Sequence, residues 1–441
     1  MKRLLPLLLC AVLALFCATT AQAAGVSITL TASEYALHYA FDAGAQDPFV
    51  ILEYTTPAEK GWMMLYSADG HFEGDVSLAY SGAGGKTSVA LTSARTTGSI
   101  GKASTTLPKA ADYQKPTGKS NAKVTDFVLT ETPEGFHYAF NAIGTDYMLL
   151  YWRSKEQTVT QPVYPDENGH YEGDVVSELT FARTQFTVQV KSGSGSMKKE
   201  ATVRKGYQAP EAPQRQEGRL SGVTVCIDAG HQENGRFVNE PIGPGLTGST
   251  SGKGGMAQGT KTNRRESIVC LEIGMLLRDE LLRQGANVVM TREDQTTFHT
   301  NIERCEIAEA GGAQIMLRLH CNNSSNHSKR GIQVYGPLNS DYAKAVADAD
   351  TYREMGQKLL DAMKTRVGMT LANSTGMVRL NDNYVGNNWA KMMCFLVEMG
   401  YLSNPAEEYL LVTPVYQQWL AEGMADGVYE IAVARGWVQA Q

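Results

Sequence analysis

The sequence predicts a multidomain chain, with two all-β modules of the immunoglobulin-like sandwich type followed by an α/β domain whose mainly parallel sheet is flanked by helices. Three observations support this prediction. The first half contains a segment repeated at a spacing of 99 residues, its many short strand patterns are separated by turn residues, and strand and helix patterns alternate from residue 221 onward. The length of 441 residues, 43% of them hydrophobic, suits about two to four globular domains.

The overall charge argues against a nucleic-acid partner. The chain has 40 basic and 46 acidic residues, a net charge of −6, whereas proteins that neutralise phosphates usually carry a basic surplus. The seven cysteines are too few for a disulfide framework in a chain of this length. Five of them follow residue 221, mostly in apolar surroundings, and we expect mostly free thiols there.

The N-terminus has the features of a secretory signal peptide over residues 1–23. Lys2 and Arg3 precede an apolar run, and small residues lead to a cleavage site near Ala23. The apolar run is about 15 residues, shorter than the ~20 that a spanning helix needs. We therefore expect a protein secreted or held in the cell envelope, without a membrane span after signal removal. Loss of the two basic residues leaves 38 against 46 acidic ones, a charge of −8.

Two β modules are expected at 24–112 and 122–207, the second repeating the first at an offset of 99 residues. The sequence His-Tyr-Ala-Phe at 38–41 recurs at 137–140, and we expect the register to hold without a gap over residues 28–76. Aromatic residues that alternate with smaller ones predict strands.

The repeat also contains turn and polar patterns. Asp-Gly at 69–70 and Asn-Gly at 168–169 predict hairpin turns. The polar pattern His71-x-Glu73-x-Asp75 has two interpretations, a metal or sugar site and the outer polar face of a hairpin, and the second is favoured. The ligand of the β modules is left unknown.

The remaining histidines are the candidates for chemistry, since four of the eight belong to the repeat. They are His231, His299, His320 and His327. His299 and His327 lie in polar stretches, for which a solvated loop role is favoured.

A linker at 208–220 leads to the α/β domain at 221–441. Strands are expected at 223–227, 288–290, 315–319, 331–335 and 394–397. Helices are expected at 268–282, 302–310, 342–366 and 416–435. This alternation is typical of a mainly parallel sheet covered by helices.

Three apolar strands of this domain end in residues that can bind a metal or move a proton. They end in His231, His320 and Glu398, and Glu266 begins the helix after a long loop. Ligands collect beyond the carboxyl ends of parallel strands, and two histidines plus one carboxylate with an open position are typical of catalytic zinc. We therefore expect one Zn²⁺ per chain, held by His231, Glu266 and His320, with Glu398 taking the proton of an activated water.

Other polar residues near these strands have weaker signals. Arg292, Asp294 and Arg304 could bind substrate, but a salt-bridge set that joins strand to helix is favoured. Cys321 adjoins His320, yet on a strand its side chain points to the opposite face, so it is not counted as a ligand. The chain contains no His-Glu-x-x-His motif and no Gly-x-Ser-x-Gly motif.

The motifs of residues 221–435 occur in an order that resembles a known family. They are Asp228-Ala229-Gly230-His231, Arg265-Glu266, Thr291-Arg292-x-Asp294, Glu303-Arg304, the Leu-His-Cys-Asn run at 319–322 and the Leu-Val-Glu-Met-Gly-Tyr-Leu-Ser-Asn run at 396–404. This set resembles the zinc-dependent N-acetylmuramoyl-L-alanine amidases of the type 3 fold.

The resemblance implies peptidoglycan as substrate and cleavage of the amide between N-acetylmuramic acid and L-Ala of the stem peptide. It also implies His231, Glu266 and His320 as zinc ligands and Glu398 as the catalytic acid/base. Two alternatives stay open: another zinc hydrolase, such as a peptidase or deacetylase acting on cell-wall material, and a wall-binding protein with a vestigial site. A Gly-rich loop at 243–259 is expected over the cleft, and we expect no inserted helix to plug the site, although 342–352 is the segment to watch.

Overall fold

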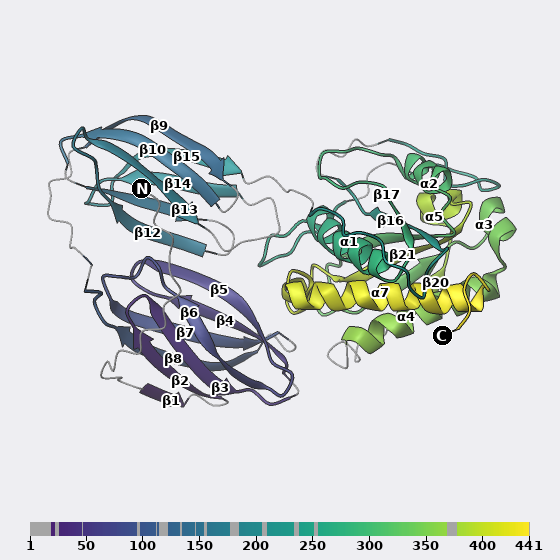
Figure 1. The fold of residues 1–441 in the computed structure, drawn as a ribbon, viewed down its shortest axis with the longest axis horizontal. Helices are drawn as coiled ribbons and strands as arrows, with labels where there is room; N and C mark the ends of the chain where they lie inside the picture. Colours follow the sequence, from purple (N-terminus) through teal and green to yellow (C-terminus); the bar gives the residue numbers. More distant parts are fainter. Residues whose placement is uncertain are drawn as a thin grey trace.

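The computed structural model shows two β modules and one α/β domain (Figure 1). It describes residues 19–22, 26–45, 47–94, 98–111, 113, 122–132, 135–145, 147–153, 157–176, 185–204, 210–232, 238–250, 255–367 and 377–440. Most of the proposed signal peptide and parts of both interdomain linkers lie outside these residues. Within 1–23, only strand β1 (Thr19–Gln22) is described, and it pairs with β2. None of the described helices is long and apolar enough to cross a membrane.

The first β module is a sandwich of two antiparallel sheets. Strands β2 (Ser27–Ser33), β3 (Ala36–Asp42) and β6 (His71–Ser77) form one layer. The other layer has the order β5 (Glu59–Tyr66), β4 (Phe49–Thr55), β7 (Gly85–Ser93) and β8 (Ser99–Leu107). Alternating apolar side chains of both layers fill the core between them. The chain crosses from one layer to the other after β3, after β5 and after β6, as in immunoglobulin-like sandwiches.

The second module repeats this order and shares a sheet with the first. Its layers are β9 (Lys123–Thr132), β10 (Gly135–Ile143) and β13 (His170–Val176) against β12 (Gln157–Val163), β11 (Met148–Arg153), β14 (Gln185–Lys191) and β15 (Met197–Arg204). Because β12 pairs with β5 of the first module, the two larger layers form one continuous eight-stranded sheet.

The expectation of a gapless repeat is wrong in one strand. The core residues of β3 and β10 do correspond at the offset of 99, as do those of β6 and β13. In β4, however, the core-facing residues Val50 and Leu52 correspond to Met148 and Leu150 of β11, an offset of 98. The connection before β11 is one residue shorter, and side chains must keep their strand parity to stay inside.

The expected hairpins at Asp69–Gly70 and Asn168–Gly169 are also wrong. Strands β5 and β6 belong to different sheets, as do β12 and β13, so each turn carries the chain across the sandwich. Gly70 is required at the first of these turns because of its backbone conformation and the lack of space for a side chain. Its φ is +85°, and a Cβ atom would lie 2.2 Å from the carbonyl carbon of Gly44, so only glycine fits the turn.

The α/β domain is built on a six-stranded sheet. Its order is β17 (Asn287–Met290), β16 (Thr224–Ala229), β18 (Ile315–Asn322), β21 (Met393–Tyr401), β19 (Gln333–Gly336) and β20 (Met377–Leu380). Neighbouring strands are parallel except β19 and β21, which are antiparallel. β20 was not expected from the sequence.

Helices cover both faces of this sheet (Figure 1). They are α1 (Glu266–Arg283), α2 (Asn301–Ala310), α3 (Asp341–Val346), α4 (Ala349–Val367), α5 (Val385–Trp389), α6 (Glu407–Leu411) and α7 (Pro414–Ala434). The single helix expected at 342–366 is two helices, because Ala347 between them is extended, with φ −165° and ψ 163°. The short helices α5 and α6 had no signal in the sequence.

Strand β16 shows how one strand serves both faces. Val225 and Ile227 join the core under α1, α4 and α7, whereas Cys226 joins a smaller core with Cys305 and Cys394 beside α2 and α5. The five cysteines of this domain are buried and free, as expected.

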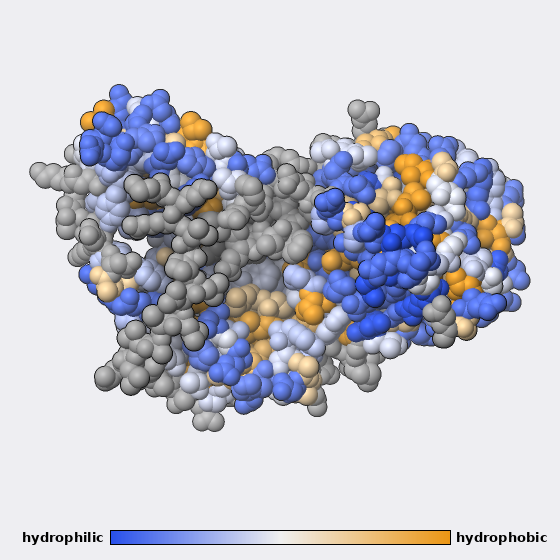
Figure 2. Space-filling model, viewed as in Figure 1, coloured by the Kyte–Doolittle hydropathy of each residue, from blue (hydrophilic) through white to orange (hydrophobic). Residues whose placement is uncertain are grey.

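In Figure 2 the outer side of the domain, where α1 and α7 lie, carries mostly hydrophilic residues.

The first β module packs directly against the α/β domain. Phe49 and Ile51 of β4 face away from their own module and join the core of the α/β domain. The Phe49 ring contacts Tyr416 and Trp419 of α7 edge-on, with centroids 6.1 and 5.5 Å apart. Trp62 of β5 contacts Tyr409 of α6 in the same way, at 5.1 Å.

Candidate metal centre

Two strands and one helix bring His231, Glu266 and His320 together. His231 follows β16, His320 lies near the end of β18, and Glu266 is the first residue of α1. β16 and β18 are parallel neighbours, so their carboxyl ends meet at one edge of the sheet. One nitrogen of each histidine and one carboxylate oxygen of Glu266 lie within 4.8 Å of one another, an arrangement that can hold a metal ion.

The Glu266 carboxylate is the centre of this group. Its Oε1 atom lies 3.1 Å from His231 Nε2 and 2.9 Å from His320 Nδ1. The backbone N–H of Cys321 donates to Oε1 and that of Ala257 donates to Oε2, at 3.0 and 2.7 Å. Burial raises the pKa of Glu266, but the hydrogen bonds from both histidines outweigh burial and hold the pKa well below its usual range. Glu266 is therefore an anion at neutral pH.

A tight backbone approach orients His231. The N–H of Gly230 donates to the carbonyl oxygen of Leu319 on β18 at 2.9 Å. A Cβ atom on Gly230 would lie 2.4 Å from that oxygen and 2.7 Å from the His320 ring, so a side chain does not fit there. His231 itself has a φ of +57°, an uncommon conformation for a non-glycine residue that turns the chain sharply off the strand.

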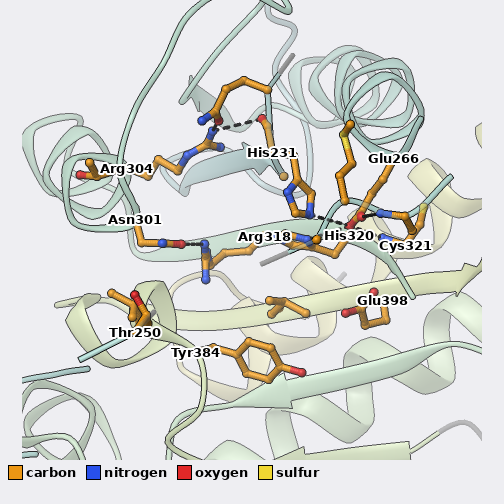
Figure 3. Close-up of a pocket in the computed structure, with 18 of the residues that line it drawn as sticks. His231, Thr250, Glu266, Asn301, Arg304, Arg318, His320, Cys321, Tyr384 and Glu398 are labelled. Atoms are coloured by element: carbon orange, nitrogen blue, oxygen red, sulfur yellow. Dashed lines mark hydrogen bonds and ion pairs between the residues drawn. The ribbon is translucent and has the colours of Figure 1, made fainter. Parts of the chain in front are cut away.

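Glu398 lies beside this group on the neighbouring strand (Figure 3). It stands opposite His320 in the parallel register of β18 and β21. Its Oε2 atom is buried and has no hydrogen-bond partner in the described part of the chain. Burial, and next the negative charge of Glu266, raise the pKa of Glu398 well above its usual range. A carboxyl group with a raised pKa can both accept and return a proton near neutral pH.

The donors at this site fit a bound cation. His320 Nε2 is buried and lacks a hydrogen-bond partner among the described residues, like Glu398 Oε2. Burial also lowers the pKa of His320, which favours the neutral imidazole that binds metals. Two imidazoles and one buried carboxylate are the donor set of catalytic zinc sites.

A buried charge network supports the strand ends below the group. Asp228 of β16 is fully buried and accepts hydrogen bonds from Thr291 Oγ1 at 2.8 Å and Arg318 Nε at 2.9 Å. Arg304 forms a third contact with it. Although burial raises the pKa of Asp228, the two guanidinium groups hold it far below the usual range. Arg318 precedes His320 by two residues on β18, so the network fixes the strand that presents this histidine.

The favoured interpretation of Arg292, Asp294 and Arg304 as one salt-bridge set needs correction. Arg304 does join strand to helix, but its partner is Asp228. Arg292 binds backbone carbonyl groups instead, among them those of Ala229 and Gly230 at 2.7 and 2.8 Å. The Asp294 carboxylate accepts hydrogen bonds from the loop that follows it.

A cleft of about 750 Å³ opens over the metal group. Arg304, Arg318, Tyr384 and Glu398 line it, and Thr250 stands at its rim (Figure 3). His299 also lines it, from a partly exposed position in the loop before α2, in agreement with the favoured solvated loop role. The expected Gly-rich loop at 243–259 lies only partly within the described residues, and its described ends border the cleft.

Two further expectations concern the surroundings of the cleft. The N-terminal part of the watched segment 342–352 forms α3, which packs against α5 beside Trp389. His327 is a loop anchor, because its Nδ1 atom lies 2.6 Å from the carbonyl oxygen of Ser403.

Arg318, Tyr384 and Asn301 were not singled out from the sequence. Arg318 had one detectable signal, its placement two residues before His320 on the same strand face.

The fold and the site define the class of this protein: an α/β enzyme domain with a metal-binding group at the carboxyl ends of parallel strands. Residues 225–430 match the family described as N-acetylmuramoyl-L-alanine amidase. These residues form an N-acetylmuramoyl-L-alanine amidase domain.

Individual proteins are similar to this domain. The germination-specific N-acetylmuramoyl-L-alanine amidase of Bacillus subtilis (strain 168) is 26% identical over 231 residues, which are 49% of this chain and 83% of that protein. The probable cell wall amidase LytH of Staphylococcus aureus is 27% identical over 218 residues, 48% of this chain and 60% of that protein. Among solved structures, an N-acetylmuramoyl-L-alanine amidase from Clostridium difficile 630 matches with 24% identity and a TM-score of 0.38, covering 48% of this chain and 96% of that one.

Proposed function

We propose that this protein is an exported zinc amidase that acts on peptidoglycan, cleaving the amide bond between the lactyl group of N-acetylmuramic acid and L-Ala of the stem peptide. The observation that carries this proposal is the position of Glu398, directly across the parallel register from His320. A proton-transferring carboxyl group thus stands next to the group formed by His231, Glu266 and His320. The amidase domain supports the substrate class.

His231, Glu266 and His320 would hold one zinc ion per chain. When bound there, zinc supplies Lewis-acid polarisation of the scissile carbonyl and lowers the pKa of a water molecule to near 7. The hydrogen bonds from Ala257 and Cys321 keep the Glu266 carboxylate charged and fix its orientation. The left-handed backbone at His231 and the Asp228 network hold the two histidines in place before substrate arrives.

Glu398 would perform both proton transfers. As a base it accepts a proton from the attacking water, and as an acid it returns this proton to the leaving nitrogen of L-Ala when the C–N bond breaks. Its burial favours the protonated form, which aids the second transfer. The products are a muramic acid carboxylate and a peptide with a free L-Ala amino terminus.

The cleavage position is tested by mass spectrometry of digested sacculi, with and without a chelator. We expect muropeptide fragments with free L-Ala amino termini and none of these after chelation. Released acetate would point to a deacetylase, and cleavage between two amino acids of the stem would point to a peptidase. Intact sacculi incubated with zinc-loaded protein would support a wall-binding protein with a vestigial site.

A further inference from the structure

The chain folds back on itself just before α1, over residues 257–266. The N–H of Glu266 donates to the carbonyl oxygen of Ala257, and the N–H of Gly259 donates to that of Arg264, both at 2.9 Å. Between these two contacts, residues 258 and 265 form an antiparallel bridge. We call this segment the 257–266 turn. Its paired arms place the tip, residues 260–263, at the opposite end from Glu266.

The base of the 257–266 turn holds the carboxylate of Glu266. The N–H of Ala257 donates to Oε2 of Glu266 at 2.7 Å, while Oε1 faces the two histidines. Ala257 is therefore hydrogen-bonded to both the backbone and the side chain of the same residue. A shift of Ala257 would rotate this carboxylate relative to His231 and His320.

The tip of the turn is held by Glu408 of α6, whose side chain is fully buried. Its Oε1 atom accepts a hydrogen bond from Thr260 Oγ1 at 2.8 Å. Its Oε2 atom accepts from the backbone N–H groups of Lys261 and Thr262, at 2.9 and 3.1 Å, and from Thr262 Oγ1 at 3.2 Å. Within the described residues, every hydrogen bond to this carboxylate comes from these three consecutive residues.

The donors around Glu408 are neutral groups. No basic side chain of the described residues forms an ion pair with it. A buried carboxylate is costly unless donors surround it, and successive backbone N–H groups of a turn can form such an anion-binding concavity. The carboxylate of Glu408 is therefore satisfied only when the 257–266 turn is ordered around it, so the two features fix each other.

Gly259 shows how closely the turn surrounds this carboxylate. A Cβ atom on Gly259 would lie 2.3 Å from Thr262 Oγ1 and 2.5 Å from Glu408 Oε2. A side chain at this position would displace one of these atoms. The contact thus depends on one residue of α6 and on one glycine of the turn, far apart in the chain.

We propose that Glu408 is a positioning residue of the metal group: it fixes the tip of the 257–266 turn, and the paired arms transmit this constraint to Ala257 and so to the carboxylate of Glu266. The inference rests on the proposed role of Glu266 as a zinc ligand. Glu408 belongs neither to the metal group nor to the lining of the cleft. A change at Glu408 therefore reaches the zinc ion only through the turn.

The test measures the zinc affinity of the full-length chain by competition with a chromophoric chelator. In Glu408→Gln, an amide NH₂ replaces an oxygen that accepts hydrogen bonds from the turn. We expect the Kd for zinc to rise by roughly 10–100-fold, the usual effect of losing a group that orients a metal ligand. Gly259→Ala, which displaces the carboxylate from the side of the turn, should give a similar rise. The double variant should add little to either, because both changes act on one contact.

Three control variants should keep the wild-type zinc affinity. Glu354→Gln removes an exposed carboxylate of α4, and Gly255→Ala adds a methyl group in open space. Leu359→Ala creates a cavity in the core beneath α4 and lowers the stability of the fold. This last variant separates a loss of stability from a loss of metal affinity. Thermal melting curves establish that each variant is folded at the temperature of the measurement.

The outcomes distinguish this inference from the proposed function. His320→Ala, which removes a proposed ligand, sets the scale for a lost ligand. If the wild type binds zinc and both Glu408→Gln and Gly259→Ala bind it equally well, the positioning role is wrong and the proposed function stands. If Leu359→Ala weakens zinc binding as much as Glu408→Gln does, the effect reflects stability and the positioning role is again wrong. A wild-type chain that binds no zinc would remove the proposed function and this inference together.

Discussion

Two glutamates in one cleft show how residue environment sets chemical role. Glu266 and Glu398 are both buried, and burial alone raises the pKa of each. Glu266 receives two backbone and two imidazole hydrogen bonds, so its charged form is favoured and it suits a metal ligand. Glu398 has an unpartnered oxygen and the charge of Glu266 nearby, so its neutral form is favoured and it suits proton transfer.

The role of Glu398 predicts a specific phenotype for Glu398→Gln. Glutamine keeps the shape of the side chain but cannot accept the proton of water, so we expect the cleavage rate to fall by roughly 10²–10⁴-fold. Zinc content should stay at the wild-type value, since His231, Glu266 and His320 are unchanged. Release of L-Ala amino termini and bound zinc are measured on the same preparation. A variant that retains full activity would remove Glu398 from the mechanism.

The Asp228 network predicts a large stability loss for Asp228→Asn. Arg304 and Arg318 would remain buried without their anion, which costs about 3–5 kcal/mol. Because the folded-state pKa of Asp228 is lowered, its stabilising contribution is complete above the unfolded pKa and falls as the pH drops toward the folded value. Denaturant unfolding at neutral pH measures the loss, with Asp350→Asn, whose side chain is 94% exposed, as a control expected to change little. Equal stability of the two variants would contradict this account.

At the scale of elements, short α6 ties the end of β21 to the loop before β19. Glu407, its first residue, accepts hydrogen bonds from the N–H groups of Gly331 and Tyr401, both at 2.8 Å. Tyr401, Ser403 and Asn404 belong to the run at 396–404 whose pattern resembles the amidase family. Asn404 in turn binds the carbonyl groups of His327 and Lys329. Through these contacts, the run at 396–404 holds the end of β21, the strand that carries Glu398, in place.

Glu407 predicts a pH dependence of stability. Burial raises its pKa to about 7, despite the two backbone hydrogen bonds that lower it. The folded state therefore binds the proton more tightly than the unfolded chain does. The contribution of Glu407 to the free energy of unfolding is complete below about pH 4.5. This contribution falls by about 3 kcal/mol in all as the pH rises toward 7. Glu407→Gln should show a flatter stability profile over this range than the wild type, whereas the exposed Glu430→Gln should not. Denaturant midpoints at several pH values measure the slope, and parallel profiles would refute the prediction.

At the scale of the whole molecule, one strand belongs to two cores. β4 directs Val50 and Leu52 into its own module and Phe49 and Ile51 into the α/β domain. The corresponding strand of the second module, β11, has only Met148, Leu150 and Trp152 fully buried. Buried aromatic contacts of this size favour a fixed arrangement over a flexible tether. The first β module should therefore hold the amidase domain at a fixed position relative to the second β module.

The variant Phe49→Ala should weaken this junction. Loss of the ring removes contacts with Tyr416 and Trp419 and leaves a cavity, a change that costs about 3–5 kcal/mol. Calorimetry should resolve two transitions in place of one shared transition, and X-ray scattering should show a broader distribution of interdomain distances. The control Val128→Ala changes a side chain that is 55% exposed, so it should behave like the wild type. An unchanged scattering profile for Phe49→Ala would mean that the junction does not depend on this contact.

The sequence by itself determined the order of the domains, the alternation of strands and helices and the positions of His231, His320 and Glu398 at strand ends. These features depend on local periodicity and on chain direction, because parallel strands bring their carboxyl ends to one edge. The family assignment was also available from short motifs in their order.

Only the tertiary structure decided which distant groups meet. Asp228 and Arg318 are 90 residues apart in the chain, and their pairing depends on the neighbouring positions of β16 and β18. The shared eight-stranded sheet, the shifted register of β11 and the packing of Phe49 on α7 likewise depend on which surfaces cover each other. The polar pattern around Glu73 was visible in the sequence, but the pairing of His71 with Asp42 across β3 and β6 was not. Side-chain periodicity specifies which face is buried, whereas the contact partners of that face are set by packing between segments far apart in the chain.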